Sequence, residues 1–164
     1  MAEPRFDPDR MLRVLAAHDV DFVLIGGYAA ALHGSDHLTF DVDITPSRDA
    51  ANLDRLSEAL HELRARVRVD GIEGGLEFQH DGPSLARASM WNLVTDAGDL
   101  DLSFEPCGTD GWADLHRGAV TVGLVSGPTE VASLADIVRS KETANRPKDQ
   151  LVLPTLRRLL RLSR

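Results

Sequence analysis

The sequence predicts a mixed α/β fold with a helical C-terminal end. Short apolar runs of strand type alternate with amphipathic helical segments over most of the chain, and beyond residue 133 only helical patterns occur. At 164 residues, 43% of them hydrophobic, the chain is long enough for one domain with a real core. We therefore expect a single domain over residues 1–164, with its core at about 8–125 and a helical part at about 129–164.

Four elements are expected in the N-terminal part of the chain. Apolar residues on one helical face predict a helix over 8–18, and the apolar run at 21–25 is typical of a short strand. The pair Gly26–Gly27 ends that strand, and the Ala-rich stretch after it predicts a helix of about two turns that Gly34 closes. The alternating, β-branched segment 38–44 predicts a second strand.

The middle of the chain predicts one long helix and three short strands. Leucines recur at helical spacing over 48–63, and Ser47 is the expected N-cap of this helix. Strands are expected at about 76–79, 90–95 and 99–104.

The C-terminal part predicts mostly helices. We expect a helix from a Thr109 cap through Arg117, a strand over 119–125 and a helix over 133–144. Pro147 suits the first turn of a further helix, which Pro154 is expected to kink or divide.

Composition excludes several classes of protein. The six histidines and the single Cys107 lack the spacings that hold structural zinc, and one cysteine cannot form an internal disulfide. No apolar run approaches the roughly 20 residues of a membrane span, and the N-terminus has no secretory apolar region, so we expect a cytoplasmic protein. A net charge of -8 requires any nucleic acid to bind a local basic patch.

Two aspartates end the second predicted strand. Alternate strand residues share a face, so Asp41 and Asp43 place their carboxylates side by side, with Cα atoms about 6 to 7 Å apart. Such carboxylates repel each other unless a cation joins them, and their oxygens suit Mg²⁺ or Mn²⁺. The alternative is an ordinary solvated strand edge.

The glycine pair supplies a candidate phosphate site. Gly26 and Gly27 open a helix, so the backbone allows close approach, and the free N–H groups there attract anions. A simple tight turn is the alternative. Together, the glycines would bind phosphate while Asp41 and Asp43 bind a metal ion.

The order of these elements resembles that of the DNA polymerase β type nucleotidyltransferase superfamily: a strand, a glycine turn, a helix and a second strand with Asp-x-Asp. The resemblance implies a mixed-sheet nucleotidyltransferase core flanked by helices, a nucleoside triphosphate substrate and a third carboxylate on a neighbouring strand. Asp99 and Asp101 share one face of the strand around "GDLDLS", and we choose Asp101, with Asp99 as the alternative. Three carboxylates can hold two divalent ions about 3.5 to 4 Å apart.

Within the superfamily the chain is most similar to the AbiEii/MenT group of toxin nucleotidyltransferases. The early motif is "GGYAAALHGSDHLTFDVDI" and the late one is "SKETANRPKD". The chain departs from the group where Asp36 or His37 replaces an arginine, so it lacks one cation that would face phosphate.

The resemblance implies roles for the late motif. Lys141 is the expected partner of the triphosphate, with Arg146 and Lys148 completing the nucleotide-binding set, and Asp149 orients a lysine or the acceptor. The expected catalytic residues are Asp41, Asp43, Asp101, Lys141 and Asp149.

Thr39 lies two residues before Asp41 and shares its strand face. One interpretation of Thr39 is an ordinary strand residue. The resemblance implies another, a regulatory phosphorylation site, because members of the group are silenced by a cognate antitoxin kinase that phosphorylates a hydroxyl beside the catalytic aspartate. A phosphate would add about -1.5 to -2 charges there.

The resemblance also implies the acceptor. Toxins of this group, from toxin–antitoxin systems, are similar to enzymes that add nucleotides to the 3′ end of tRNA. Two arginine clusters could bind RNA, at Arg64, Arg66 and Arg68 and at Arg157, Arg158, Arg161 and Arg164. The alternatives are an antitoxin that modifies a protein hydroxyl, an aminoglycoside-like small-molecule nucleotidyltransferase, and a non-catalytic binding module.

Overall fold

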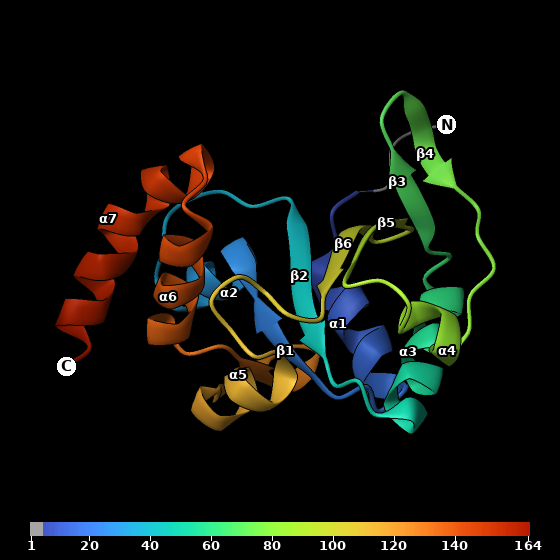
Figure 1. Ribbon diagram of the computed structural model, residues 1–164, viewed down its shortest axis with the longest axis horizontal. Coiled ribbons are helices and arrows are strands. Elements are labelled where there is room, and N and C mark those ends of the chain that lie inside the picture. The colour runs from blue at the N-terminus through green and yellow to red at the C-terminus, as the bar shows by residue number, and fades with distance from the viewer. Residues whose placement is uncertain (1–4) are drawn as a thin grey trace.

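The computed structural model describes residues 5–164 and has a mixed α+β fold, as the sequence predicts (Figure 1). Its sheet has eight strands in the order β4-β3-β5-β6-β2-β1-β8-β7. The strands are β1 (Phe22–Ile25), β2 (Asp41–Pro46), β3 (Arg66–Val69), β4 (Ile72–Leu76), β5 (Met90–Thr95), β6 (Gly98–Ser103), β7 (Val120–Leu124) and β8 (Gly127–Val131). The helices are α1 (Pro8–Ala17), α2 (Gly26–Leu32), α3 (Ala50–Glu62), α4 (Gly82–Leu85), α5 (Trp112–Gly118), α6 (Leu134–Ala144) and α7 (Pro147–Leu162).

The two central strands, β2 and β6, are parallel neighbours in register. Val42 pairs with Leu100 and Ile44 with Leu102, and all four side chains are fully buried. They pack in one core with the buried leucines of α1 and α3. Because side chains alternate along a strand, the residues between these leucines and valines point to the opposite face of the sheet. The core therefore fixes which side of the sheet Asp41, Asp43 and Asp101 face.

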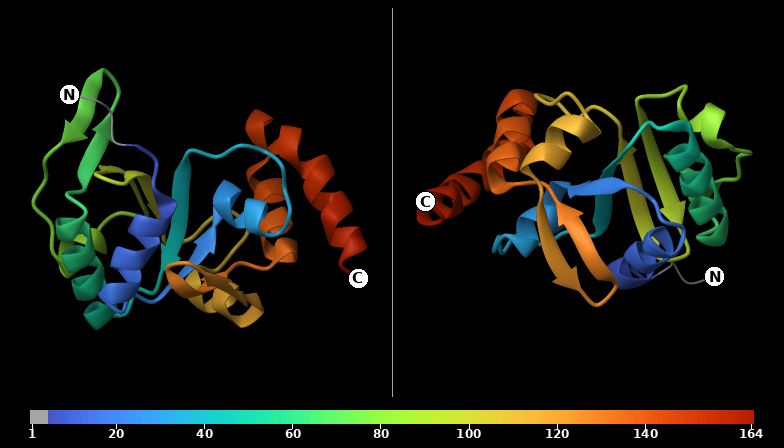
Figure 2. Two further views of the ribbon diagram at one scale, coloured as in Figure 1. Left: turned by 180° about the vertical axis from the view of Figure 1, so that it is seen from behind. Right: turned by 90° about the horizontal axis from the view of Figure 1, so that it is seen from below.

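The remaining elements lie toward the two ends of the sheet. The β3–β4 hairpin projects at one end, and α6 and α7 pack against each other at the opposite end, where the C-terminus lies (Figures 1 and 2). Helix α2 directly follows β1 and contacts β2, so the segment between β1 and β2 stays beside the centre of the sheet. This placement brings the glycine turn close to the two aspartates of β2.

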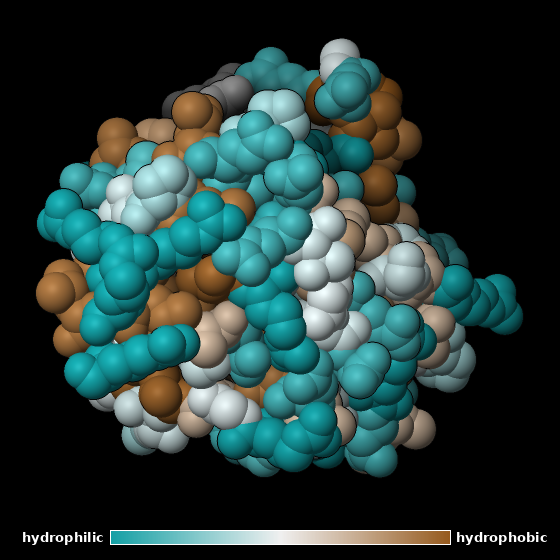
Figure 3. Space-filling view, turned by 60° about the vertical axis from the view of Figure 1, so that its left-hand side comes forward, coloured by the Kyte–Doolittle hydropathy of each residue, from teal (hydrophilic) through white to brown (hydrophobic). Residues whose placement is uncertain are grey.

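The last helix is not divided by its proline. Pro154 is exposed and lies inside α7, which continues from Pro147 to Leu162. The buried Leu153 and Leu156 attach α7 to the core, whereas Leu151 and Leu162 are exposed. The surface on this side of the molecule mixes hydrophilic and apolar patches (Figure 3). Among the described residues no helix is both long and apolar enough to cross a membrane.

Several local predictions were wrong. Ser47 does not cap α3, which begins at Ala50 after Asp49; instead the Ser47 hydroxyl accepts a hydrogen bond from the Asp49 amide at 3.3 Å. Helix α5 begins after Gly111 rather than Thr109, whose hydroxyl bonds the Pro106 carbonyl within the preceding turn. The expected strand at 76–79 ends instead at Leu76, as β4. Strands β3 and β8 and the short α4 were not predicted.

Candidate active site

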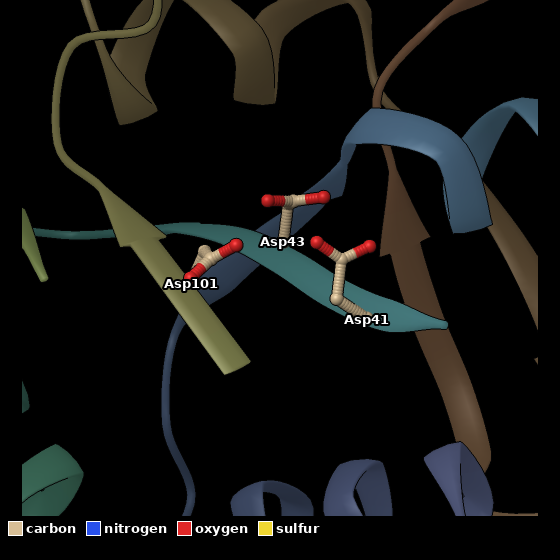
Figure 4. Close-up of side chains that lie close together, drawn as sticks. All are labelled: Asp41, Asp43 and Asp101. Atoms are coloured by element: carbon tan, nitrogen blue, oxygen red, sulfur yellow. The ribbon is translucent and has the colours of Figure 1, made fainter. Parts of the chain in front are cut away.

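The three predicted acids converge on one side of the sheet. Asp43 on β2 pairs in register with Asp101 on β6, and Asp41 precedes Asp43 by two residues. One carboxylate oxygen of each lies within 4.8 Å of those of the other two, and Figure 4 shows the side chains pointing toward a common space. Each is only partly exposed. Strand alternation and the parallel register together produce this cluster.

Burial and repulsion between neighbouring acids make the carboxylates of Asp43 and Asp101 costly to ionise. Burial, followed by the charges of Asp41 and Asp101, raises the pKa of Asp43 to about 7. Burial also raises the pKa of Asp101 to about 6, although the Arg68 guanidinium opposes this rise. A divalent cation among the three would relieve the repulsion, and an all-carboxylate oxygen donor set matches the preference of Mg²⁺ or Mn²⁺. The residues present therefore fit a hard divalent metal ion.

The glycine turn lies against this cluster. Gly26 has a left-handed φ of +72°, and a Cβ atom there would overlap the Asp43 carboxylate. A Cβ on Gly27 would lie 3.1 Å from the Thr39 hydroxyl. Only glycine fits at position 26, because the Asp43 carboxylate occupies the space that a side chain would need. The sequence pattern alone does not show this relationship.

Thr39 contacts Asp41 directly. Its hydroxyl donates to Oδ1 of Asp41 at 3.1 Å and lies 3.3 Å from the Asp41 carbonyl oxygen. The side chain is half-buried, between the glycine turn and the acidic cluster. A group attached to this hydroxyl would enter the space between them.

The late-motif residues form a charged group centred on Asp149. This carboxylate is fully buried, accepts hydrogen bonds from the Arg146 amide at 3.1 Å and its Nε at 2.8 Å, and lies 3.5 Å from Nζ of Lys141. Burial alone would raise the pKa of Asp149, but the Arg146 hydrogen bonds and the Lys141 charge lower it below its ordinary value. Asp149 is therefore ionised and fixes both cations.

The charges of this group and of the acidic cluster influence each other. The charge of Lys148 lowers the pKa of Asp43, and the charge of Asp43 contributes to raising the pKa of Arg146. Lys141 remains 17% exposed and Arg146 54% exposed, so both can reach a solvent-borne anion. The late motif, from a distant part of the sequence, therefore lies near enough to the acids for their charges to influence each other.

One residue near the cluster was missed by sequence reasoning. Arg68 was assigned to a surface basic cluster, but its guanidinium lies 3.1 Å from Asp101 and 3.4 Å from Asp99. Arg64 and Arg66 of the same cluster lie 3.8 and 3.7 Å from Asp96. The alternation in "RVRV", which forms β3, was the available signal, because it places Arg66 and Arg68 on one strand face.

The fold was compared with known proteins. No family model matches the sequence, and no curated protein matches it. Among solved structures, the lincosamide antibiotic adenylyltransferase LnuA, bound to lincomycin, superimposes with a TM-score of 0.60 at 14% identity, over 92% of this chain and 94% of that chain.

Two further structures are similar. A candidate nucleotidyltransferase from Thermotoga maritima gives a TM-score of 0.56 at 17% identity, over 93% of this chain and 89% of that one. The antibiotic-resistance factor ANT(2'')-Ia gives 0.54 at 16% identity, over 94% and 80%. At these identities the likeness establishes the fold: the chain has the fold that these nucleotidyltransferases share.

Proposed function

We propose that the protein is a metal-dependent nucleotidyltransferase that transfers a nucleotide from a nucleoside triphosphate to an acceptor hydroxyl and releases pyrophosphate. The convergence of Asp41, Asp43 and Asp101 beside the glycine turn is the observation that carries this proposal. The shared nucleotidyltransferase fold supports it.

Each acid has a proposed role. Asp41 and Asp43 hold a divalent ion, Mg²⁺ or Mn²⁺, and Asp101 completes a site for a second ion. Such ions, when bound, neutralise the triphosphate and favour ionisation of the attacking hydroxyl. In this proposal Asp101 also accepts the proton of the acceptor hydroxyl.

The nucleotide's phosphates are assigned to the basic late motif and the glycine turn. Lys141, Arg146 and Lys148 supply positive charge beside the acids, and Gly26–Gly27 presents backbone without side chains. Asp149 acts through Lys141 and Arg146, which it holds in place. A bound phosphate would add an anionic partner to Arg146, which is 54% exposed, and to Lys141, which is 17% exposed.

Thr39 is the proposed regulatory phosphorylation site. Its hydroxyl hydrogen-bonds Asp41, so a phosphate there would place about -1.5 to -2 charges against the acidic cluster. That charge would repel the incoming triphosphate and compete for its cations. A cognate antitoxin kinase is the proposed source of this modification.

For the acceptor we propose the 3′ end of tRNA, as in a toxin of a toxin–antitoxin system. The support is the similarity of the two motifs to the AbiEii/MenT group, together with the exposed Arg158, Arg161 and Arg164 at the C-terminal end of α7. A second candidate, a hydroxyl of a small antibiotic, is favoured by the similarity of the fold to lincosamide and aminoglycoside resistance enzymes.

A labelling experiment separates these acceptors. The purified protein is incubated with each α-³²P-labelled nucleoside triphosphate, Mg²⁺ or Mn²⁺, and deacylated total tRNA, lincomycin, tobramycin or protein extract. The proposal predicts labelled tRNA with the wild type and with Asp70→Asn, an exposed acid on the β3–β4 turn, but not with Asp41→Asn. Label on an antibiotic or a protein would replace tRNA as the acceptor, and no label on any species would contradict nucleotidyl transfer.

A further inference from the structure

Arg68 reaches across the sheet to the acidic cluster. It lies on β3, which is separated from β6 by β5. Its Nη2 donates to Oδ1 of Asp101 at 3.1 Å, lies 3.4 Å from Oδ2 of Asp99 and donates to the Leu93 carbonyl of β5 at 3.1 Å. One guanidinium nitrogen therefore connects three strands at the edge of the proposed active site.

These contacts fix the orientation of the guanidinium. Its Nη2 is held by a backbone carbonyl as well as by two carboxylates, and only 33% of the side chain is exposed. Its Nε is buried without a hydrogen-bond partner. A buried, unpaired donor lowers stability, so the contacts of Nη2 must hold this side chain in place.

The contact with Asp101 restricts that carboxylate. A carboxylate that accepts a charge-assisted hydrogen bond on one oxygen loses rotational freedom and keeps its remaining lone pairs for other partners. Asp101 is 16% exposed, and its other neighbours are Asp41 and Asp43. Without Arg68, the Asp101 carboxylate would rotate more freely, although a bound cation could still recruit it.

The contact with Asp99 has a second consequence. Asp99 lies two residues before Asp101 on the same face of β6 and pairs in register with Asp41. Four carboxylates therefore lie on two adjacent strands. The positive charge of Arg68 balances the negative charge of Asp99, so that this acid does not compete with the other three for a cation.

We propose that Arg68 is a positioning residue for nucleotidyl transfer: it holds the Asp101 carboxylate in the orientation in which it faces Asp41 and Asp43, without contacting the substrate itself. This inference rests on the proposed function of Asp101. It implies that Arg68 raises the rate of transfer, while its positive charge disfavours a divalent ion at the same acid. Loss of Arg68 therefore affects catalysis and metal binding in opposite directions.

The test compares Arg68→Gln with two matched variants. Arg68→Lys keeps the charge but loses the planar guanidinium, and Arg55→Gln removes an arginine of α3 that contacts the Asp19 carbonyl and Asp21 but none of the three acids. We expect kcat to fall roughly 10- to 100-fold in Arg68→Gln and less in Arg68→Lys, with KM for the triphosphate unchanged. Arg55→Gln should keep the wild-type kcat.

Calorimetry of Mn²⁺ binding without nucleotide gives a second readout. If Arg68 only supported the structure of the site, its loss would weaken Mn²⁺ binding. Arg68→Gln should bind Mn²⁺ at least as tightly as Arg55→Gln, with an unchanged melting temperature. An unaltered kcat in Arg68→Gln would overturn the inference, as would Mn²⁺ binding weaker than in Arg55→Gln. If the wild type transfers no label at all, the proposed function is wrong, whatever the role of Arg68. In that case the Mn²⁺ comparison alone decides whether Arg68 restrains Asp101 or supports the site as a whole.

Discussion

Gly26 lies directly against the Asp43 carboxylate, and no side chain fits between them. The glycine turn and the acidic strand are therefore one interdependent unit. The left-handed φ of +72° at Gly26 adds a second reason for glycine, since L-residues rarely adopt it. Any residue larger than glycine must displace Asp43 or the turn.

Gly26→Ala should abolish nucleotidyl transfer, with a loss of at least about 100-fold, because a 1 Å displacement of a catalytic group has this effect. Mn²⁺ binding should weaken as well, since Asp43 is a proposed ligand. Labelled-nucleotide transfer and calorimetry measure the two effects.

Gly71→Ala is the matched control for this variant. Gly71 also has a positive φ, +80°, but a Cβ there would meet nothing within 4 Å. It should lose about 1–2 kcal/mol of stability from backbone strain alone and keep its activity. If Gly26→Ala were as active as Gly71→Ala, the close packing of turn and carboxylate would have no catalytic importance.

The elevated pKa of Asp43 predicts how metal-free stability depends on pH. The folded-state pKa is about 7, against 3.8 ordinarily, so the folded protein binds this proton more tightly than the unfolded chain does. The resulting stabilisation is complete below about pH 4 and is lost as the pH rises to about 7. Asp43→Asn should therefore gain melting temperature relative to the wild type over this range, in the presence of a chelator.

Added Mg²⁺ or Mn²⁺ should restore the stability that the metal-free protein loses as the pH rises to about 7. The metal ion requires ionised carboxylates, so its affinity should rise between pH 5 and pH 8, and the increase should be smaller in Asp43→Asn, which keeps Asp101 with its raised pKa. Thermal melts at several pH values, with metal and with chelator, test both effects. Asp70→Asn, at an exposed acid, should behave as the wild type does. A wild type whose metal-free melting temperature follows that of Asp43→Asn at every pH would contradict the assigned shift.

The acidic cluster was predictable because its determinants are local. The Asp-x-Asp spacing places Asp41 and Asp43 on one strand face, and the flanking leucines of β6 place Asp101 opposite a buried face. The extent of β5, Met90–Thr95, was also correct, because alternation and β-branching agree there.

The contacts between distant segments were not predictable in the same way. The "RVRV" alternation indicates the strand face on which Arg68 lies but not its contact with Asp101, because that contact depends on the order of β3, β5 and β6 in the sheet. The helix caps failed for a related reason: Ser47 and Thr109 bond within turns that precede their helices. Pro154 is tolerated inside α7 because it lies on the exposed side, while Leu153 and Leu156 anchor the helix.

Asp149→Asn should lower stability and weaken triphosphate binding. The buried carboxylate accepts charge-assisted hydrogen bonds from Arg146, and losing such a bond costs about 1.5–3 kcal/mol. Because the pKa of Asp149 is lowered in the folded state, its contribution is present above the ordinary carboxyl pKa and disappears as the pH falls through the folded-state value.

Denaturant titration at pH 7 and calorimetry with a triphosphate measure these two effects. Asp114→Asn is a suitable control, since Asp114 pairs with Arg139 and Arg117 rather than with the late-motif cations. Equal triphosphate affinities in the two variants would contradict the positioning role of Asp149.

Thr39 should act as a switch rather than as a catalytic group. Thr39→Val removes the hydrogen bond to Asp41 but adds no charge, so we expect at most about a tenfold loss of transfer. Thr39→Glu, or phosphorylation of Thr39, places negative charge beside the acids and should abolish it. Steady-state labelling assays of Thr39→Val, Thr39→Glu and the phosphorylated protein measure these effects. A phosphorylated protein with full activity would disprove the switch.

The most direct test of the central claim is a crystal structure with Mn²⁺ and a non-hydrolysable nucleoside triphosphate. We predict anomalous density for Mn²⁺ bound by Asp41, Asp43 and Asp101, with the phosphates between the Gly26–Gly27 turn and Lys141. Mn²⁺ bound away from the three carboxylates, or a triphosphate bound elsewhere on the protein, would contradict the account.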